Sequence, residues 1–138
     1  EIDLCSDTAI NPKGFWEPVK PNKQKCIQIE RDKFYILRSK ERFRLPKDVG
    51  VYCQAITENL GEIRIHYAGF VHPGFGFSRD EGTPLIFEVR GHTVDAFLRD
   101  GELMAKVSFY RTSCDESLTL GDYDKQELKL SKKFRPWQ

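Results

Sequence analysis

One glutamate lies inside a run of apolar residues. Glu88 sits between Phe87 and Val89 in residues 85–90, a segment that reads as a buried strand. Because successive side chains of a strand point to opposite faces, Glu88 faces away from its two neighbours. Two explanations stay open for this carboxylate: it is solvated on an outer face, or it serves a binding or catalytic site.

A glycine-rich turn precedes this strand. Residues 66–77 read His-Tyr-Ala-Gly-Phe-Val-His-Pro-Gly-Phe-Gly-Phe. Glycines in a tight turn allow backbone amides to approach another group closely, and a flat ring is one candidate for that group. His72 lies inside the turn and is the histidine best placed for a function, although an exposed turn residue is the alternative.

The histidines do not predict a metal centre. His66, His72 and His92 lack the i, i+4 spacing of a helical ligand pair, and no cysteine or second carboxylate lies at ligand spacing in the sequence. The His-x-Glu and Pro-Cys-x-x-Cys pattern of zinc deaminases is also absent. We therefore expect no metal site formed by the protein, and no zinc.

The C-terminal segment is rich in hydrogen-bond donors. Residues 121–133 include Tyr123, Lys125, Gln126, Lys129, Lys132 and Lys133. A polyphosphate can recruit such donors when a tail closes over it. A solvated basic tail is the alternative.

Short runs with strand character must position these residues. They recur about every eight to twelve residues, which is typical of an all-β sandwich or barrel. The runs are 26–30, 34–38, 42–45, 50–56, 62–67, 85–90, 93–98 and 103–110. We expect an irregular lead-in segment over 1–25, held against the β domain by Phe15 and Trp16. The β domain covers 26–113 and a tail covers 114–138. Within the tail, the sequence allows a helix only near 124–133.

Composition excludes several classes of protein. The 138 residues suit one domain, and 22 Lys plus Arg against 21 Asp plus Glu give a net charge of +1, so no global field favours nucleic acid or a membrane. The four cysteines are widely spaced, which indicates reduced thiols. The sequence begins without a basic and apolar leader. We expect a soluble, cytoplasmic protein.

Together these residues resemble the dCTP deaminase branch of the dUTPase-like superfamily, over about residues 32–133. Five segments carry the resemblance: 32–37 with 43–49, like the family's opening hairpin with its Leu-Pro-x-Asp turn; 68–75, like its nucleoside-binding turn; 87–89, like the strand with its catalytic glutamate; 100–109, like its late hairpin; and 123–126, Tyr-x-x-Gln, like the tail motif that folds over the triphosphate.

The chain also departs from this family. Where the family has Gly-Arg-Ser-Ser-x-x-Arg, whose serine and arginine reach a neighbouring subunit's site, residues 54–61 read Gln-Ala-Ile-Thr-Glu-Asn-Leu-Gly. His72 replaces the usual aspartate of the turn, and Asp122 stands where a lysine often precedes the tail tyrosine. The pattern most resembles the C-terminal half of the long, tandem form, in which a preceding domain would supply the missing residues.

The resemblance implies a distorted β-barrel or jelly-roll of the dUTPase-like type. It also implies zinc-independent conversion of dCTP to dUTP and ammonia, with Glu88 as general base, although the isolated half can be inactive. Substrate contacts would come from Ala68, Gly69, Phe70, His72, Tyr123, Gln126, Lys129 and Lys132. Mg²⁺ would arrive with the triphosphate. The implied partners are dCTP and dUTP, copies of the chain in a homotrimer or pseudo-hexamer, and a preceding homologous domain.

Two alternative functions stay open. A dUTP pyrophosphatase of the same fold would normally present an aspartate in the turn, where this chain has His72. A non-catalytic module that only builds the trimer would fit the loss of the Ser-Ser-x-x-Arg segment.

Overall fold

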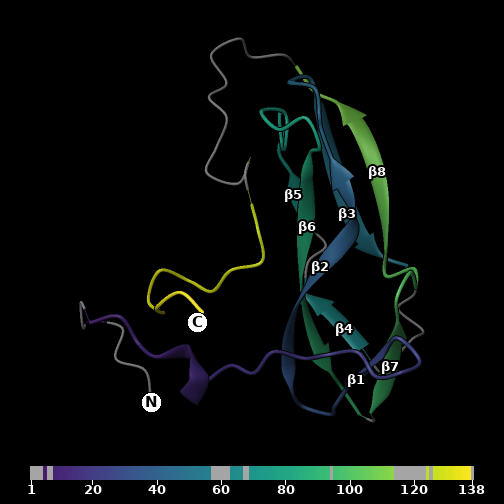
Figure 1. The fold of residues 1–138 in the computed structure, drawn as a ribbon. Helices are drawn as coiled ribbons and strands as arrows, with labels where there is room; N and C mark the ends of the chain where they lie inside the picture. Colours follow the sequence, from purple (N-terminus) through teal and green to yellow (C-terminus); the bar gives the residue numbers. More distant parts are fainter. Residues whose placement is uncertain are drawn as a thin grey trace.

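The computed structural model describes residues 5, 8–56, 63–66, 69–93, 95–113, 124 and 126–137. These residues form antiparallel β-sheets, with one short 3-10 helix, η1 (Pro12–Gly14), before the first strand (Figure 1). The all-β prediction is confirmed. No helix in the described part of the chain is long and apolar enough to cross a membrane.

The strands form three sheets. In chain order they are β1 (Cys26–Ile29), β2 (Phe34–Phe43), β3 (Val49–Ala55), β4 (Ile63–His66), β5 (Phe70–Val71), β6 (Thr83–Gly91), β7 (Ala96–Arg99) and β8 (Ala105–Arg111). The sheet orders are β2-β6-β4, β5-β3-β8 and β1-β7. The long strands β6 and β3 are therefore the central strands of the two larger sheets.

Alternation along the central strands builds one core between the sheets. Leu85, Phe87 and Val89 of β6 and Val51 and Cys53 of β3 all belong to the same buried cluster. Val51 and Val89 are fully buried. The residues between them in sequence therefore point outward, and the core fixes which side chains of each sheet are available for a site.

Two of the expected strands are one strand in the structure. We expected separate strands at 34–38 and 42–45, but β2 runs from the first into the second, ending at Phe43, and pairs with β6 on either side of a bulge between Arg38 and Arg42. Ser39 stabilises the bulge, because its hydroxyl accepts a hydrogen bond from the Leu85 N–H (2.9 Å) and donates one to the Glu41 carbonyl (2.6 Å). A side chain thus replaces the missing ladder partner.

The glycine-rich turn packs against the chain's own backbone. Gly76 has φ +69°, and a Cβ at this position would collide with the Phe43 carbonyl oxygen. Gly74 donates its N–H to the Pro46 carbonyl (3.0 Å), and Leu45 donates to the Phe75 carbonyl (2.9 Å). In this turn Gly76 therefore approaches the last residue of β2, Phe43, and Gly74 bonds to Pro46 just beyond it.

The tail is fastened to the turn before β6. Asp124 is buried: one of its carboxylate oxygens accepts the Ser78 hydroxyl, and its carbonyl accepts the hydroxyl of the fully buried Thr83. Glu127 adds an ion pair with Arg79 at 3.0 Å. Asp124 and residues 126–137 contain no α-helix, so the helix considered for this region is not present there.

Both terminal segments meet in an arm beside the sheets (Figure 1). Ile10 and Phe134 form a parallel bridge, and the Phe134 ring packs edge-on against Trp16, with centroids 6.3 Å apart. Trp16 in turn packs against Phe34 of β2, at 6.2 Å. The prediction that the aromatic residues pin the lead-in segment is confirmed for Trp16, whereas Phe15 contacts Phe134 of the tail.

Asp95 ties the start of β7 to the end of β1. Its carboxylate accepts the Arg31 N–H and the Gln28 side-chain amide, both at 2.8 Å. The Arg31 N–H, followed by the Gln28 amide, holds the pKa of Asp95 below its ordinary value. These bonds favour the ionised form, so they stabilise the fold only while Asp95 is charged.

Substituting Ser39 with alanine should destabilise the fold. The buried Leu85 N–H would lose its acceptor, which costs about 1 to 3 kcal/mol. Urea unfolding measures this change, with Ser113→Ala at an exposed site after β8 as the matched control. An equal, small effect of both substitutions would contradict the role of Ser39 in the bulge.

Asp95 should contribute acid-sensitive stability. Because its folded-state pKa is lowered, the contribution is complete above the unfolded-state pKa of about 3.9 and is lost as pH falls through the folded-state value. Unfolding of the wild type and of Asp95→Asn should therefore differ at neutral pH and converge in acid. A difference that is constant with pH would contradict this assignment.

Candidate functional site

Glu88 lies on the outer face of the β2-β6-β4 sheet. It alternates with the core residues Phe87 and Val89, and the register places Ile36 of β2 and His66 of β4 on either side of it. Glu88 is partly buried, and among the described residues its side chain forms no hydrogen bond or ion pair. The structure thus presents a shielded carboxylate that is unengaged within the described part of the chain.

Apolar and cationic residues border this carboxylate. Along β6 its same-face neighbours are Ile86, which is partly buried, and Arg90, which is exposed. The register pairs Ile86 with Arg38 and Arg90 with Phe34. Arg38 and Phe34 therefore occupy the diagonal positions of β2, about 7 to 8 Å from Glu88 between backbones. The carboxylate has an apolar residue beside it and one arginine toward each end of the strand.

Phe70 and His72 lie on the other large sheet. Phe70 pairs with Tyr52, which alternates with the core residues Val51 and Cys53, so its side chain points away from the core on the β5-β3-β8 sheet. Its ring covers Gly50, where a Cβ would lie 2.7 Å from ring atoms. His72 is exposed and packs edge-on against the Phe70 ring, with centroids 5.3 Å apart.

The Phe70 and His72 side chains are therefore not gathered with Glu88 in this structure. The backbone leading to them is closer, because His66 is opposite Glu88 in the register and β4 ends at His66. Gly69 uses its carbonyl to accept the Cys53 N–H (3.1 Å). Ala68 lies outside the described residues. The substrate-contact roles of these four residues stay predictions.

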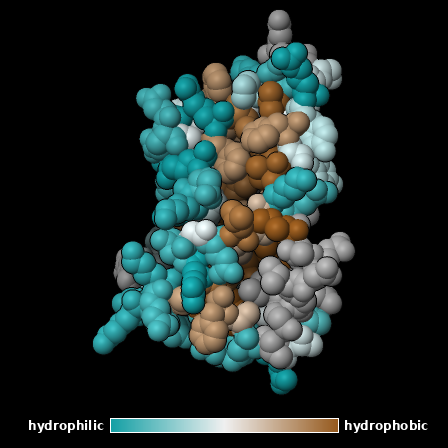
Figure 2. All heavy atoms as spheres, turned by 90° about the vertical axis from the view of Figure 1, so that its right-hand side faces the viewer, coloured by the Kyte–Doolittle hydropathy of each residue, from teal (hydrophilic) through white to brown (hydrophobic). Residues whose placement is uncertain are grey.

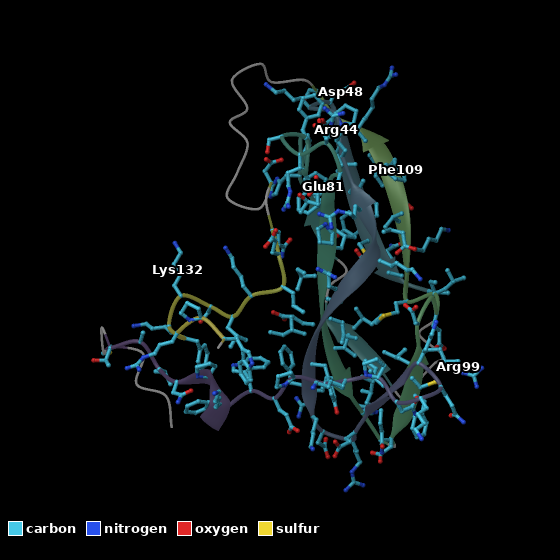
Figure 3. All side chains as sticks on the ribbon, in the orientation of Figure 1. Arg44, Asp48, Glu81, Arg99, Phe109 and Lys132 are labelled. Atoms are coloured by element: carbon cyan, nitrogen blue, oxygen red, sulfur yellow. The ribbon has the colours of Figure 1, made fainter. Side chains whose placement is uncertain are left out.

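The predicted tail residues are split between described and undescribed positions. Tyr123 lies outside the described residues. Gln126 is partly buried, whereas Lys129 and Lys132 are exposed. In Figure 3 Lys132 stands on the arm beside the strands, with its side chain extending upward from the arm. Closure of these residues over a triphosphate stays a prediction.

Sequence reasoning missed the residues that place the tail. Asp124 lies beside Thr83 at the start of β6. Phe134 packs against Trp16, and Trp16 packs against Phe34. Phe34 is paired with Arg90, near the end of β6. The described tail is thus anchored near both ends of the strand that carries Glu88. The sequence offered one weak signal, an aspartate among the basic residues of the tail.

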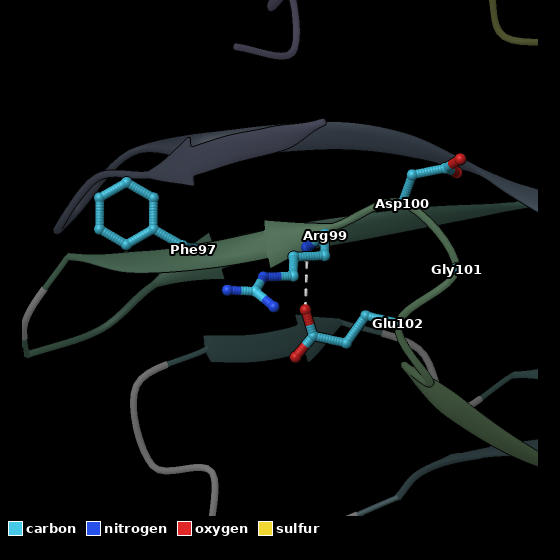
Figure 4. A pocket seen from close by; sticks show the side chains of 5 residues that line it. All are labelled: Phe97, Arg99, Asp100, Gly101 and Glu102. Carbon is cyan, nitrogen blue, oxygen red and sulfur yellow. Dashed lines mark hydrogen bonds between the residues drawn. The ribbon is translucent and has the colours of Figure 1, made fainter. Parts of the chain in front are cut away.

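A separate depression lies at the turn between β7 and β8. It is lined by Phe97, Arg99, Asp100, Gly101 and Glu102 (Figure 4). Glu102 accepts the Arg99 N–H at 2.9 Å, so its carboxylate is used in holding the turn. No predicted site residue lines this depression. Among the described residues no group of three or more histidine, cysteine or acidic residues is arranged to hold a metal ion.

Comparison with known proteins agrees with this fold. A family model described as "2'-deoxycytidine 5'-triphosphate deaminase (DCD), C-terminal domain" matches residues 1–134. The crystal structure of 2'-deoxycytidine 5'-triphosphate deaminase from Agrobacterium tumefaciens is similar, with 31% sequence identity and a TM-score of 0.65. That match covers 71% of this chain but 30% of the Agrobacterium chain. No curated protein sequence matches the chain.

These matches agree with the dUTPase-like fold expected from the sequence. The family model covers nearly the whole sequence, including the lead-in segment and the docked tail. This chain belongs to the family of dCTP deaminase C-terminal domains.

Proposed function

We propose that this domain takes part in the zinc-independent deamination of dCTP to dUTP and ammonia, with Glu88 as general base. The observation that carries the proposal is the state of Glu88, a partly buried carboxylate on an outer sheet face with no described partner for its side chain. A general base must be able to accept a proton from a reactant within hydrogen-bond reach, so a carboxylate committed to an ion pair would serve poorly.

In this proposal Glu88 draws a proton from a water molecule as the water oxygen attacks C4 of cytosine. A carbon–oxygen bond forms at C4, and the carbon–nitrogen bond to the amino group breaks. Glu88 then passes the proton to the leaving nitrogen, which departs as ammonia. Ile36 and Ile86 beside the carboxylate limit the access of other water to it.

The tail would hold the phosphate end of the nucleotide. Gln126, Lys129 and Lys132, with Tyr123, would contact the triphosphate, and Mg²⁺ would arrive bound to its phosphate oxygens as part of the substrate. Backbone groups of Ala68, Gly69 and Phe70 would read the pyrimidine edge, with His72 beside them. Docking of the tail at Asp124, beside the first residue of the Glu88 strand, supports this arrangement.

We propose further that a homologous domain completes the site, within a homotrimer or pseudo-hexamer. The stretch that replaces the Ser-Ser-x-x-Arg segment supplies no equivalent serine pair or arginine. Figure 2 shows an apolar band on the side where β8 lies, flanked by hydrophilic residues. Phe97, Leu103 and Phe109, from β7, β8 and the link between them, are 61, 78 and 59% exposed. Exposed apolar surface of this kind is typical of interfaces.

Replacing Glu88 with glutamine should abolish ammonia release from dCTP. The amide keeps the shape of the side chain but cannot accept the proton, and loss of a general base lowers the rate by about 10² to 10⁴-fold. The assay uses the full chain, alone and mixed with a homologous domain that carries the Ser-Ser-x-x-Arg segment. Ammonia and pyrophosphate are followed with dCTP and with dUTP.

Glu41→Gln is the matched control, because Glu41 is an exposed glutamate of β2 outside the proposed site. It should leave the rate of ammonia release unchanged. Pyrophosphate release from dUTP would instead support a dUTP pyrophosphatase. If every variant is folded and no mixture releases ammonia, the proposed activity is contradicted and a non-catalytic module is supported.

A further inference from the structure

One aspartate of the tail is buried against the turn that leads into β6. Asp124 is only 7% exposed. One oxygen of its carboxylate accepts the Ser78 N–H (3.4 Å), and the other accepts the Ser78 hydroxyl. Its backbone carbonyl accepts the hydroxyl of Thr83, which is fully buried. The main chain and the side chain of this one residue are therefore both bonded to the β domain.

The other contact at this end of the tail is weaker. Glu127 pairs with Arg79 at 3.0 Å, but the Glu127 side chain is exposed, and an exposed ion pair contributes little to stability. Removing one partner of a buried hydrogen bond costs more, because it leaves a buried polar group without a partner. We therefore expect the bonds of Asp124, and not the ion pair of Glu127, to hold this end of the tail.

The far end of the tail is fixed separately, to the lead-in segment. The Lys133 carbonyl accepts the Ile10 N–H (2.8 Å), and the Arg135 N–H donates to the Ile10 carbonyl (2.9 Å). The residues between Asp124 and Lys133 therefore lie between two attachments. All of these bonds are made by atoms of the chain itself, so they need no nucleotide in order to form.

We propose that Asp124 is a positioning residue, which keeps the tail docked on the turn before a nucleotide binds. This inference rests on the proposed function for its choice of nucleotide. Gln126 follows Asp124 by two residues, so chain geometry keeps their Cα atoms within about 7 Å of each other. Ordering a chain segment costs conformational entropy. A tail that is docked in advance incurs this cost on folding and not on binding, which strengthens the binding of the nucleotide.

Limited proteolysis of the full chain with trypsin tests the docking without any nucleotide. Cleavage after the exposed Lys129 requires the tail to open, and its rate follows the population of the open form. Asp124→Ala should raise this rate about tenfold or more. Asp124→Asn should restore most of the protection, because an amide can accept the Ser78 N–H and donate to the Ser78 hydroxyl.

Calorimetric titration with dCTP and with deoxycytidine tests the consequence for the substrate, in the full chain mixed with the homologous domain. Asp124→Ala should weaken dCTP binding about tenfold and leave deoxycytidine binding unchanged. The loss of negative charge alone predicts the opposite sign, because it favours an anion. Asp80→Ala is the matched control: Asp80 is an exposed aspartate of the same turn, outside these contacts, and its loss should not weaken dCTP binding.

Three results would overturn the role of Asp124. They are equal cleavage rates after Lys129 in the wild type and in Asp124→Ala, dCTP binding that is unchanged or tighter in that variant, and an equal loss of affinity for dCTP and deoxycytidine, which would indicate a general structural effect. A different result separates the two proposals. If protection of Lys129 depends on Asp124 but the wild-type mixture binds no dCTP, docking by Asp124 is upheld and the proposed deamination is contradicted.

Discussion

The candidate site depends on the alternation of side chains along β6. The strand is central in its sheet, so both of its edges are paired, and its register is held by β2 on one side and β4 on the other. Phe87 and Val89 are buried in the shared core, so the Glu88 side chain must point to the outer face of the sheet. A shift of one residue would bury the carboxylate and expose the core residues, so packing of the core also fixes the position of the proposed base.

Three local interactions maintain that register. The Ser39 hydroxyl bridges the bulge in β2, and Gly76 packs closely on Phe43 in the turn that leads into β6. The Asp124 carbonyl accepts a hydrogen bond from Thr83, the first residue of β6. None of them touches Glu88. Each of them holds β6 or a segment next to it in place. The position of Glu88 is therefore set by the strand, although its carboxylate forms no hydrogen bond among the described residues.

Local patterns predicted some of this arrangement and not the rest. The outward direction of Glu88 followed from its apolar neighbours, because alternation is a property of the strand alone. Continuity of β2 through its bulge could not be predicted, since it depends on Ser39 meeting Leu85, 46 residues away. A close backbone approach was expected in the turn, and Gly76 makes one, but its partner is the backbone at Phe43, which only the tertiary fold brings there.

The position of the cytosine ring is the central claim, and a crystal structure of the chain with its homologous partner domain, in the Glu88→Gln form with dCTP, measures it directly. The account predicts that C4 of cytosine lies beside residue 88, with one water molecule between the ring and the side chain. A nucleotide bound instead against the outer face of the β5-β3-β8 sheet, beside Phe70 and Tyr52, would contradict it.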